Sequence, residues 1–104
     1  MKRLPASFKN RSSIEIVYDI INAAREQPCL KNTLLHKSRL SYWLLKKYLD
    51  FVLSQRLLEE RIVDDVKVYF VTNKGFKFLR SYEELRNVIN SDQNDSHVFI
   101  EAKR

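Results

Sequence analysis

The fold of this chain is decided by residues 30–56, which read LKNTLLHKSRLSYWLLKKYLDFVLSQR. A short helix from Leu30 to His36 is predicted, because leucines recur there at the spacing of one side of a helix. The next four residues interrupt that pattern, and Ser41 is well placed as the N-cap of a second helix that runs to about Ser54. The stretch therefore predicts two helices joined by a short turn.

The second of these helices has two chemically different faces. Apolar side chains at every third or fourth position predict one face that packs into the core, and charged side chains with one tryptophan predict a face turned to solvent. The inward positions are Leu45, Tyr48, Leu49 and Val52, and the outward positions are Trp43, Lys46, Lys47 and Asp50.

The pattern changes after this pair of helices. The runs Leu58–Val63 and Val66–Thr72 are rich in β-prone residues, and the acidic pair Asp64-Asp65 separates them. They predict a β-hairpin, although the turn lacks the glycine that would strengthen the signal. Thr72 is then placed to cap a last helix, whose apolar positions are Phe76, Leu79, Tyr82, Leu85 and Ile89.

Another helix precedes the pair. Ser12 and Glu15 have the spacing of a capping box, and the helix is expected to end before Pro28. Its apolar positions recur at helical spacing and are Ile14, Val17, Ile20, Ile21 and Ala24.

The order of three helices, a hairpin and a helix predicts a mainly helical α+β fold of the winged helix-turn-helix type. In such a fold the second helix of the pair enters the major groove of DNA, and the hairpin is the wing. We expect a basic N-terminal arm over residues 1–11, a winged helix-turn-helix domain over 12–72, a C-terminal helix over 73–90 and a polar tail over 91–104.

Composition narrows the classes of function. With 104 residues, 44% of them hydrophobic, the chain has material for one packed domain. One glycine is too few for a glycine-rich phosphate loop, and one cysteine excludes an internal disulfide and a cysteine-rich zinc site. We therefore expect no cofactor, no metal, no small-molecule substrate and no enzymatic activity.

No apolar run approaches the roughly 18 residues of a membrane span, and no secretory signal is evident, so we expect a cytoplasmic protein without a membrane partner.

The basic charge of the chain is unevenly distributed. The formal net charge is +6, from 19 Lys and Arg against 13 Asp and Glu. Residues 30–56 hold six basic side chains against the single acid Asp50, and residues 1–11 hold four basic side chains and no acid. Residues 12–29 and 57–73 are net acidic. Positive charge gathered on the helix pair and the arm favours a polyanionic partner, which here is double-stranded DNA.

Candidate DNA contacts follow from the predicted fold, because the start of the second helix approaches base edges while flanking residues meet phosphates. Ser41 caps that helix, and the amides of its first turn can hold a phosphate. The hydroxyl of Tyr42 can bond phosphate, the two lysines can reach phosphate or guanine, and Trp43 can pack on sugar or a thymine methyl. The candidate residues are Lys31, Lys37, Arg39, Ser41, Tyr42, Trp43, Lys46, Lys47 and Lys67.

Alternatives stay open at this point. Lys46 and Lys47 could form only a solvated face, and Tyr42 and Trp43 could help to close the core. Folds of this type also serve as protein-binding or RNA-binding modules without duplex DNA, and the apolar run His97–Ile100 could add a strand to a sheet edge.

The acidic hairpin tip is repelled by phosphate, so we expect the wing to contribute less to DNA binding than the helix that starts after Ser41.

Two sequence blocks carry a family resemblance, LSYxxLKKYLDF over residues 40–51 and YxVTxKGxxFL over residues 69–79. In these blocks the chain resembles the archaeal winged-helix DNA-binding proteins of the ten-kilodalton chromatin-protein type. The resemblance implies a transcriptional regulator or nucleoid-associated protein that binds DNA as a homodimer, with the last helices of two copies paired as an antiparallel coiled coil. It also implies helix contacts at Ser41, Tyr42, Lys46 and Lys47 and a wing over Val63–Lys67.

One position matches this family in the last helix, and another departs from it. Gly75 falls on the family's glycine, where the lack of a Cβ lets the helix approach a neighbouring element closely. The family has a glycine just before the leucine pair that opens the hairpin, where this chain has Arg56. A left-handed C-cap would cost Arg about 1 kcal/mol relative to Gly, so we expect a differently shaped helix end.

The last helix is also short for a coiled coil. Residues 73–90 give about 27 Å at 1.5 Å per residue, room for about two heptads. The stripe along it could form a dimerisation seam or could cap the monomer's own core, and we favour the seam. Its residues are Phe78, Tyr82, Leu85 and Ile89.

Overall fold

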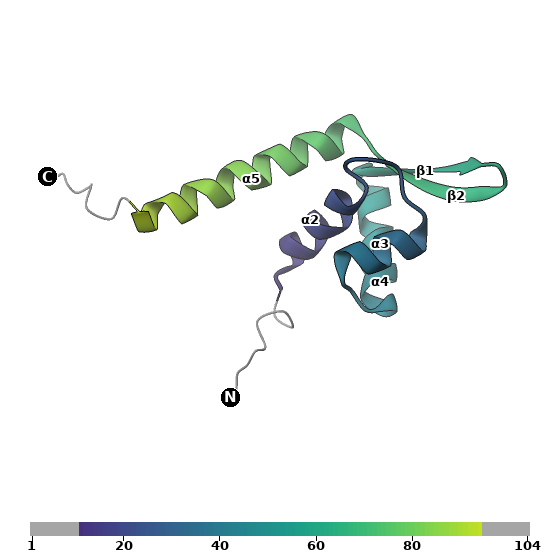
Figure 1. Cartoon of the computed structure of the whole chain (residues 1–104), viewed down its shortest axis with the longest axis horizontal. Coiled ribbons are helices and arrows are strands. Elements are labelled where there is room, and N and C mark those ends of the chain that lie inside the picture. The colour runs from purple at the N-terminus through teal and green to yellow at the C-terminus, as the bar shows by residue number, and fades with distance from the viewer. Residues whose placement is uncertain (1–10, 95–104) are drawn as a thin grey trace, which may run out of the picture.

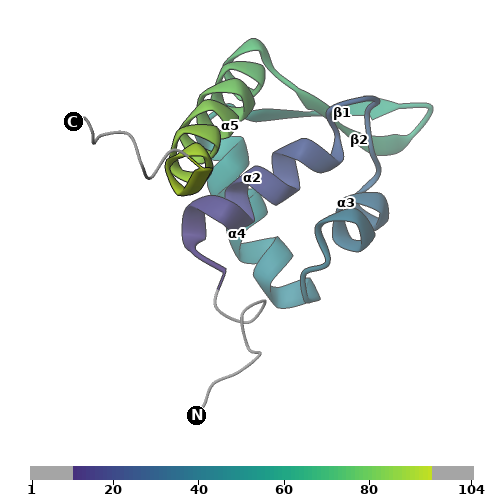
Figure 2. The same ribbon diagram turned by 60° about the vertical axis from the view of Figure 1, so that its left-hand side comes forward.

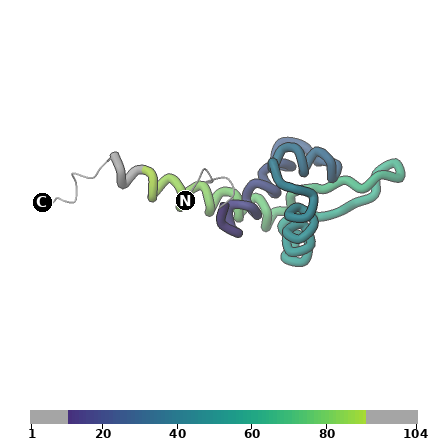
Figure 3. The backbone as a smooth tube through the Cα atoms, turned by 90° about the horizontal axis from the view of Figure 1, so that it is seen from below, coloured from purple at the N-terminus to yellow at the C-terminus, as the bar shows by residue number. Residues whose placement is uncertain are grey.

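The computed structural model describes residues 11–94, and the side chains of residues 11–90. Three helices form a body, a two-stranded antiparallel hairpin leaves it on one side, and a long helix leaves it on the other (Figure 1, Figure 3). The predicted order of elements is confirmed. The elements are α2 (Ser13–Ala23), α3 (Lys31–Ser38), α4 (Tyr42–Ser54), β1 (Leu58–Val63), β2 (Val66–Val71) and α5 (Asn73–Asn94).

Side-chain caps fix where α2, α4 and α5 begin, as the sequence predicts. Ser12 and Glu15 form a complete capping box, in which the Glu15 N–H donates to Ser12 Oγ over 3.2 Å and the Ser12 N–H donates to Glu15 Oε1 over 2.9 Å. The hydroxyls of Ser41 and Thr72 accept the N–H groups three positions later, over 3.2 Å and 2.9 Å. Each bond satisfies a backbone donor that the helix end would otherwise leave unpaired.

The core lies where α2, α3 and α4 meet and where the hairpin base and α5 pack against them (Figure 2). On α4 the predicted inward face is confirmed, with Tyr48 half-buried at its edge and the aliphatic residues buried. Ile14 differs from the other apolar positions of α2, since it lies in the first turn and is 48% exposed. The largest side chains that are fully or almost fully buried are Ile20, Ile21, Leu34, Leu45, Leu58 and Leu79.

The hairpin has a single register, which starts at the pair Leu58 and Val71 and runs to the turn. Asp64 and Asp65 form that turn, with φ of 52° and 67°. Positive φ at both central residues is the geometry of a type I′ turn, whose twist matches the twist of the strands. Aspartate tolerates left-handed backbone better than most residues, which explains why the predicted hairpin forms without glycine.

A short stretch before α3 anchors the hairpin to the body. The Cys29 N–H donates to the Tyr69 carbonyl over 3.0 Å, and the Tyr69 N–H donates to the Cys29 carbonyl over 2.7 Å. Both side chains are buried, and burial raises the pKa of the Cys29 thiol. The inner edge of β2 is therefore paired with the connection between α2 and α3.

The end of α4 corrects one expectation. Arg56 adopts the left-handed conformation, with φ 60°, that a glycine would adopt. Its N–H donates to the Leu53 carbonyl and the Leu57 N–H donates to the Val52 carbonyl, both over 3.0 Å, which is the bond pair of a Schellman motif. The helix end therefore keeps the shape that a glycine gives, because the burial of Leu57 and a 2.6 Å bond from Thr72 Oγ1 to the Arg56 carbonyl fix the chain there.

Gly75 lies where α5 starts beside the base of the hairpin. A Cβ at this position would overlap the carbonyl oxygen of Leu57 and stand 2.8 Å from Cγ1 of Val71. The carbonyl belongs to the backbone that closes α4, so it has little freedom to move. The predicted reason for this glycine, a close approach of the last helix to its neighbour, is confirmed.

The helix α5 is longer than predicted. It continues to Asn94, four residues beyond the predicted end, and spans about 33 Å at 1.5 Å per residue. No glycine or proline stands between Phe76 and Asn94, so the backbone carries no signal that stops the helix earlier. Its last turn therefore uses the start of the stretch expected as a polar tail. The run His97–Ile100 and residues 1–10 of the basic arm lie outside the described residues.

A charged cluster beside stacked rings attaches the first half of α5 to α2. Glu83 accepts bonds from Arg25 over 2.5 Å and 3.0 Å, and from the Tyr18 hydroxyl over 2.6 Å. The Arg25 bonds first, and then the Tyr18 bond, lower the pKa of the Glu83 carboxyl to about 2. Tyr82 stacks on Tyr18 with 4.6 Å between ring centroids, and the Arg86 guanidinium lies 5.1 Å from the Tyr18 centroid.

Candidate nucleic-acid interface

The turn between α3 and α4 sets the direction of α4. The first of these helices ends at Ser38, two residues beyond the predicted His36. Ser38 is buried, and its hydroxyl donates to the Leu35 carbonyl over 3.3 Å. Arg39 is left-handed, with φ 57°, and Leu40 after it is buried. The turn is therefore held from inside by small and apolar side chains, while the Arg39 side chain stays exposed.

The first turn of α4 carries two exposed aromatic residues. Tyr42 is 48% exposed and Trp43 is 73% exposed, and their rings meet edge to face with 5.5 Å between centroids. The ammonium of Lys31 on α3 lies 5.3 Å from the Tyr42 ring centroid, and that of Lys46 lies 5.8 Å from the Trp43 centroid. Both distances fall within the range of cation–π contacts. The alternative in which these rings close the core is therefore excluded.

The lysines of α4 share its exposed side with the aromatic rings. Lys46 and Lys47 are both exposed, and the Lys47 ammonium lies 5.6 Å from the ring centroid of Tyr48. Asp50 is the single acidic residue of α4 and is exposed as well. Positive charge therefore gathers in the first two turns, where the free amides of the helix start add the positive end of the helix dipole.

Two predicted residues lie apart from this surface. The Lys37 ammonium is 3.5 Å from the Ala23 carbonyl at the end of α2. Lys67 lies on β2 and forms an ion pair with Glu60 at 3.5 Å. Arg39 lies in the turn between α3 and α4, as the C-cap of α3. The structure brings together the other predicted residues, which are Lys31, Ser41, Tyr42, Trp43, Lys46 and Lys47.

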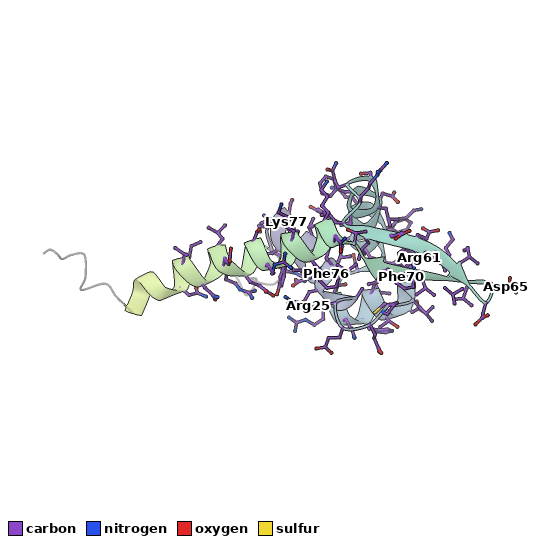
Figure 4. All side chains as sticks on the ribbon, turned by 90° about the horizontal axis from the view of Figure 1, so that it is seen from above. Arg25, Arg61, Asp65, Phe70, Phe76 and Lys77 are labelled. Atoms are coloured by element: carbon purple, nitrogen blue, oxygen red, sulfur yellow. The ribbon has the colours of Figure 1, made fainter. Side chains whose placement is uncertain are left out.

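The wing carries little unpaired positive charge. Arg61 forms an ion pair with Glu59 at 3.0 Å, and its guanidinium lies 4.4 Å from the ring centroid of Phe70 (Figure 4). Asp65 stands at the tip, at the end of the hairpin away from the body (Figure 4). Both basic residues of the strands thus have acidic neighbours, and the turn between the strands is acidic. Such a tip repels phosphate rather than attracting it.

Sequence reasoning missed two apolar residues on the exposed side of α4. Leu44 is 40% exposed and Phe51 is 49% exposed. Phe51 lines an apolar groove of about 650 Å³ between α2, α4 and α5, and Lys47 stands on the same groove. The seven-residue spacing of Leu44 and Phe51 puts them on one side of the helix, two turns apart. The seven-residue spacing is the sequence signal that could have predicted an apolar stripe on α4 outside the face that packs into the core.

A family model described as winged helix-turn-helix matches residues 10–90. The chain belongs to this family. The match includes the turn between α3 and α4, the hairpin and most of α5, which are the elements that carry and flank the surface of α4. Membership of the winged helix-turn-helix family confirms the predicted fold class.

Individual proteins are similar to this winged helix-turn-helix chain over most of its length. An uncharacterised protein of Methanocaldococcus jannaschii is 25% identical over 81 residues, which cover 78% of this chain and 79% of that protein. The crystal structure of Sso10a-2, a DNA-binding protein from Sulfolobus solfataricus, is 25% identical, with a TM-score of 0.68 over 86% of this chain and 97% of that chain. The transcriptional regulator BldR from Sulfolobus solfataricus shares the fold at 19% identity, with a TM-score of 0.62 over 94% and 70% of the two chains.

Two other kinds of site are absent from the described part of the chain. Among residues 11–94, no helix is both long and apolar enough to cross a membrane. The described residues also contain no group of three or more His, Cys, Asp or Glu side chains that could hold a metal ion.

Proposed function

We propose that this protein binds duplex DNA by placing the start of α4 in the major groove, and that it acts as a transcriptional regulator or a nucleoid-associated protein. The observation that carries the proposal is the exposed first half of α4, where two aromatic rings and two lysines share one surface and no acid precedes Asp50. The likeness to Sso10a-2, named as a DNA-binding protein, supports it. The proposed activity is binding, and no residue is assigned a catalytic role.

Each residue of this surface has a role in the proposal. The first-turn amides of α4, with the Ser41 cap, hold a phosphate at the helix start. Lys46 and Lys47 reach phosphates or guanine edges, and the Tyr42 hydroxyl donates to a phosphate oxygen. Trp43, which is 73% exposed, packs on a sugar or on a thymine methyl. Lys31 and Arg39 contact the DNA backbone beside the groove. Lys37 and Lys67, which lie apart from this surface, add weaker contacts to DNA phosphates.

A salt titration tests this proposal. The full chain should bind a labelled random duplex with a slope of log affinity against log salt near −4 to −5, because about four to six phosphates are neutralised. Lys46→Gln with Lys47→Gln should remove most of the binding and flatten the slope by about 1.8 units, at about 0.9 per lost phosphate contact. Both side chains are exposed, so the thermal midpoint should stay near that of the parent.

The matched control replaces a lysine and an arginine on α5, by Lys77→Gln with Arg80→Gln. Both residues are exposed and lie outside the proposed contacts, so this variant should keep most of the affinity. A parent affinity that does not change with salt, or the absence of binding at low salt, would contradict the proposal. Tight binding of single-stranded or double-stranded RNA with no binding of DNA would instead favour the RNA-binding alternative.

The oligomeric state forms a second part of the proposal. We propose a homodimer in which α5 pairs with its counterpart along Phe78, Tyr82, Leu85 and Ile89. The first two are half-buried against the body, whereas Leu85 and Ile89 are more than half exposed on the part of α5 that leaves the body. Exposed aliphatic residues at this spacing are typical of a helix that packs on another helix. Two joined copies would present two α4 helices to one duplex.

A further inference from the structure

The apolar groove between α2, α4 and α5 has the size of a small-molecule site. Its volume is about 650 Å³, and pockets that hold small organic ligands measure about 300–1,000 Å³. Two of its apolar side chains stay in contact with water, since Ile14 is 48% exposed and Phe51 is 49% exposed. The aliphatic and phenylalanine residues that line it are Ile14, Val17, Phe51, Leu57 and Phe78. The groove therefore offers apolar surface for a ring of an organic molecule.

The polar groups on this groove are neutral or positively charged. The described residues of its lining include no Asp or Glu, and the polar ones are Ser13, Lys47, Tyr48, Gln55 and Lys74. The hydroxyls of Ser13 and Tyr48 bond each other at 2.9 Å, and the Lys74 ammonium donates to the Gln55 carbonyl over 2.8 Å. An ammonium has three N–H donors, so the Lys74 ammonium keeps donors for a ligand. A ligand that complements this lining joins an apolar body to a negative charge.

A second copy of the chain complements the groove less well. Phe78 lines the groove and also belongs to the proposed dimerisation seam, so the two sites adjoin. Residues 73–90 hold four basic side chains against Glu83 and Glu84, and Glu83 is already paired with Arg25. Another α5 would therefore bring net positive charge to a groove that is itself positively charged. The charge of the lining favours a small anion as the occupant.

Lys47 connects the groove to the proposed DNA surface. It lines the groove, and it is also one of the two lysines of α4 that the proposed function assigns to phosphate or guanine. A carboxylate at its ammonium would neutralise charge that DNA needs. Two ligands that compete for one group weaken each other's binding by the same factor.

We propose that this groove binds a small aromatic carboxylate, with its rings beside Phe51 and Phe78 and its carboxylate on the ammonium groups of the two lysines, and that this ligand competes with DNA for Lys47. Binding of the carboxylate stands on the groove alone, whereas the competition rests on the proposed binding of DNA by α4. An organic acid of this class then acts as an effector that releases the protein from DNA.

Isothermal titration calorimetry of the full chain without DNA tests the site. The probe is naphthoate, a two-ring aromatic carboxylate, and its control is naphthamide, which has the same rings and no charge. Naphthoate should saturate one site per copy, and naphthamide should bind about tenfold more weakly, because hydrogen bonds to a charged acceptor are stronger. Equal affinities, or binding that does not saturate, would overturn the proposal. Binding of naphthoate by Leu85→Lys but not by the parent would assign the groove to a second copy and overturn it too.

Three variants separate the contributions of charge and apolar contact. Lys74→Gln, outside the proposed DNA contacts, should weaken naphthoate about fivefold and leave naphthamide nearly unchanged. Phe51→Ala should weaken both probes, because it removes apolar surface from the groove. Both side chains are exposed, so the thermal midpoints should stay near that of the parent. Lys77→Gln is the control, since Lys77 is exposed on α5 and does not line the groove. An equal loss of naphthoate binding in Lys74→Gln and Lys77→Gln would overturn the site.

A titration with DNA tests the competition. At constant ionic strength of about 0.1 M, saturating naphthoate should weaken binding of a labelled random duplex about eightfold, which is the contribution of one phosphate contact. Naphthamide should have no such effect, and the duplex should weaken naphthoate by the same factor. Duplex affinity that naphthoate does not change would overturn the competition. A parent that binds no DNA would defeat the proposed function, and the calorimetric test would still decide whether the groove is a carboxylate site.

Discussion

Arg56 holds a backbone conformation that glycine adopts at lower cost. Its φ is 60°, its side chain is exposed, and a left-handed residue other than glycine costs about 1–2 kcal/mol. Replacing Arg56 by glycine would remove this strain, but glycine is also more flexible in the unfolded chain, which offsets part of the stabilisation. Arg56→Gly should therefore raise the free energy of unfolding by about 0.5–1 kcal/mol. Urea denaturation followed by circular dichroism measures this change.

The neighbouring residue provides the control. Gln55 has φ −86°, an ordinary helical value, so Gln55→Gly should lower the free energy of unfolding by about 0.5–1 kcal/mol. A loss of stability in both variants would mean that the left-handed conformation of Arg56 carries no strain.

Glu83 couples stability to pH. Its folded-state pKa is lowered to about 2, from an ordinary value of 4.5, chiefly by the bonds from Arg25. A depressed carboxyl pKa contributes stability that is fully present above about pH 4.5 and is lost as pH falls toward about 2. Glu83→Gln should therefore lower the urea midpoint at pH 7 and reduce the decline of that midpoint between pH 4.5 and pH 2. The exposed neighbour substitution Glu84→Gln should leave the parent's pH profile nearly intact, and an unchanged profile in Glu83→Gln would refute the coupling.

At the scale of single residues, the features that could be predicted from the sequence are those that depend on residues close by in the chain. The caps Ser12, Ser41 and Thr72 act on N–H groups three positions away, so their spacing is visible in the sequence. The bond from Arg25, which follows the end of α2, to Glu83 on α5 joins residues 58 positions apart, and nothing local marks it. The left-handed state of Arg56 is likewise imposed by tertiary packing, which outweighs the local preference of arginine.

The hairpin is the element whose turn can be improved. Asp64 and Asp65 both have positive φ, a combination for which Asn-Gly is the favoured pair. Asp64→Asn with Asp65→Gly should raise the free energy of unfolding by about 1 kcal/mol if both positions lose their backbone strain. The thermal midpoint should rise with it. Differential scanning calorimetry measures the midpoint.

Charge and backbone effects at this turn must be separated. The control Asp64→Asn with Asp65→Asn removes the same two charges but supplies no glycine, so it should give a smaller gain. An equal gain in both variants would assign the effect to relief of charge repulsion between the aspartates rather than to the turn conformation.

Element type was predictable here, and element ends were less so. The helix pair, the hairpin and the last helix follow from the periodicity of apolar residues, which is set by backbone geometry. The predicted end of α5 falls four residues too early, because Asn and Ser favour helix ends but do not stop a helix as Gly and Pro do. For the candidate surface, the sequence predicts the outward face of α4 but not the exposure of Leu44 and Phe51 beside it.

The outline of the whole molecule separates a compact body from a helix that leaves it (Figure 1, Figure 3). The contacts that hold α5 to α2 are centred on Leu79, Tyr82 and Glu83, so the part after Glu83 has fewer neighbours in its own copy. A helix of about 33 Å whose second half bears aliphatic residues in water would lower its free energy by burying them. The proposed dimer supplies that burial.

Leu85→Lys tests the seam without disturbing the body. Leu85 is 55% exposed within one copy, so lysine there should leave the monomer folded but place a charge in the seam. Sedimentation equilibrium should give a dimer mass for the parent and a monomer mass, or a dimer weakened at least tenfold, for Leu85→Lys. Asn87→Lys adds the same charge about half a helical turn away, at an exposed position off the stripe, and should remain dimeric. A Leu85→Lys protein as dimeric as its parent would place the seam elsewhere, and a monomeric parent would mean that each α4 binds DNA alone.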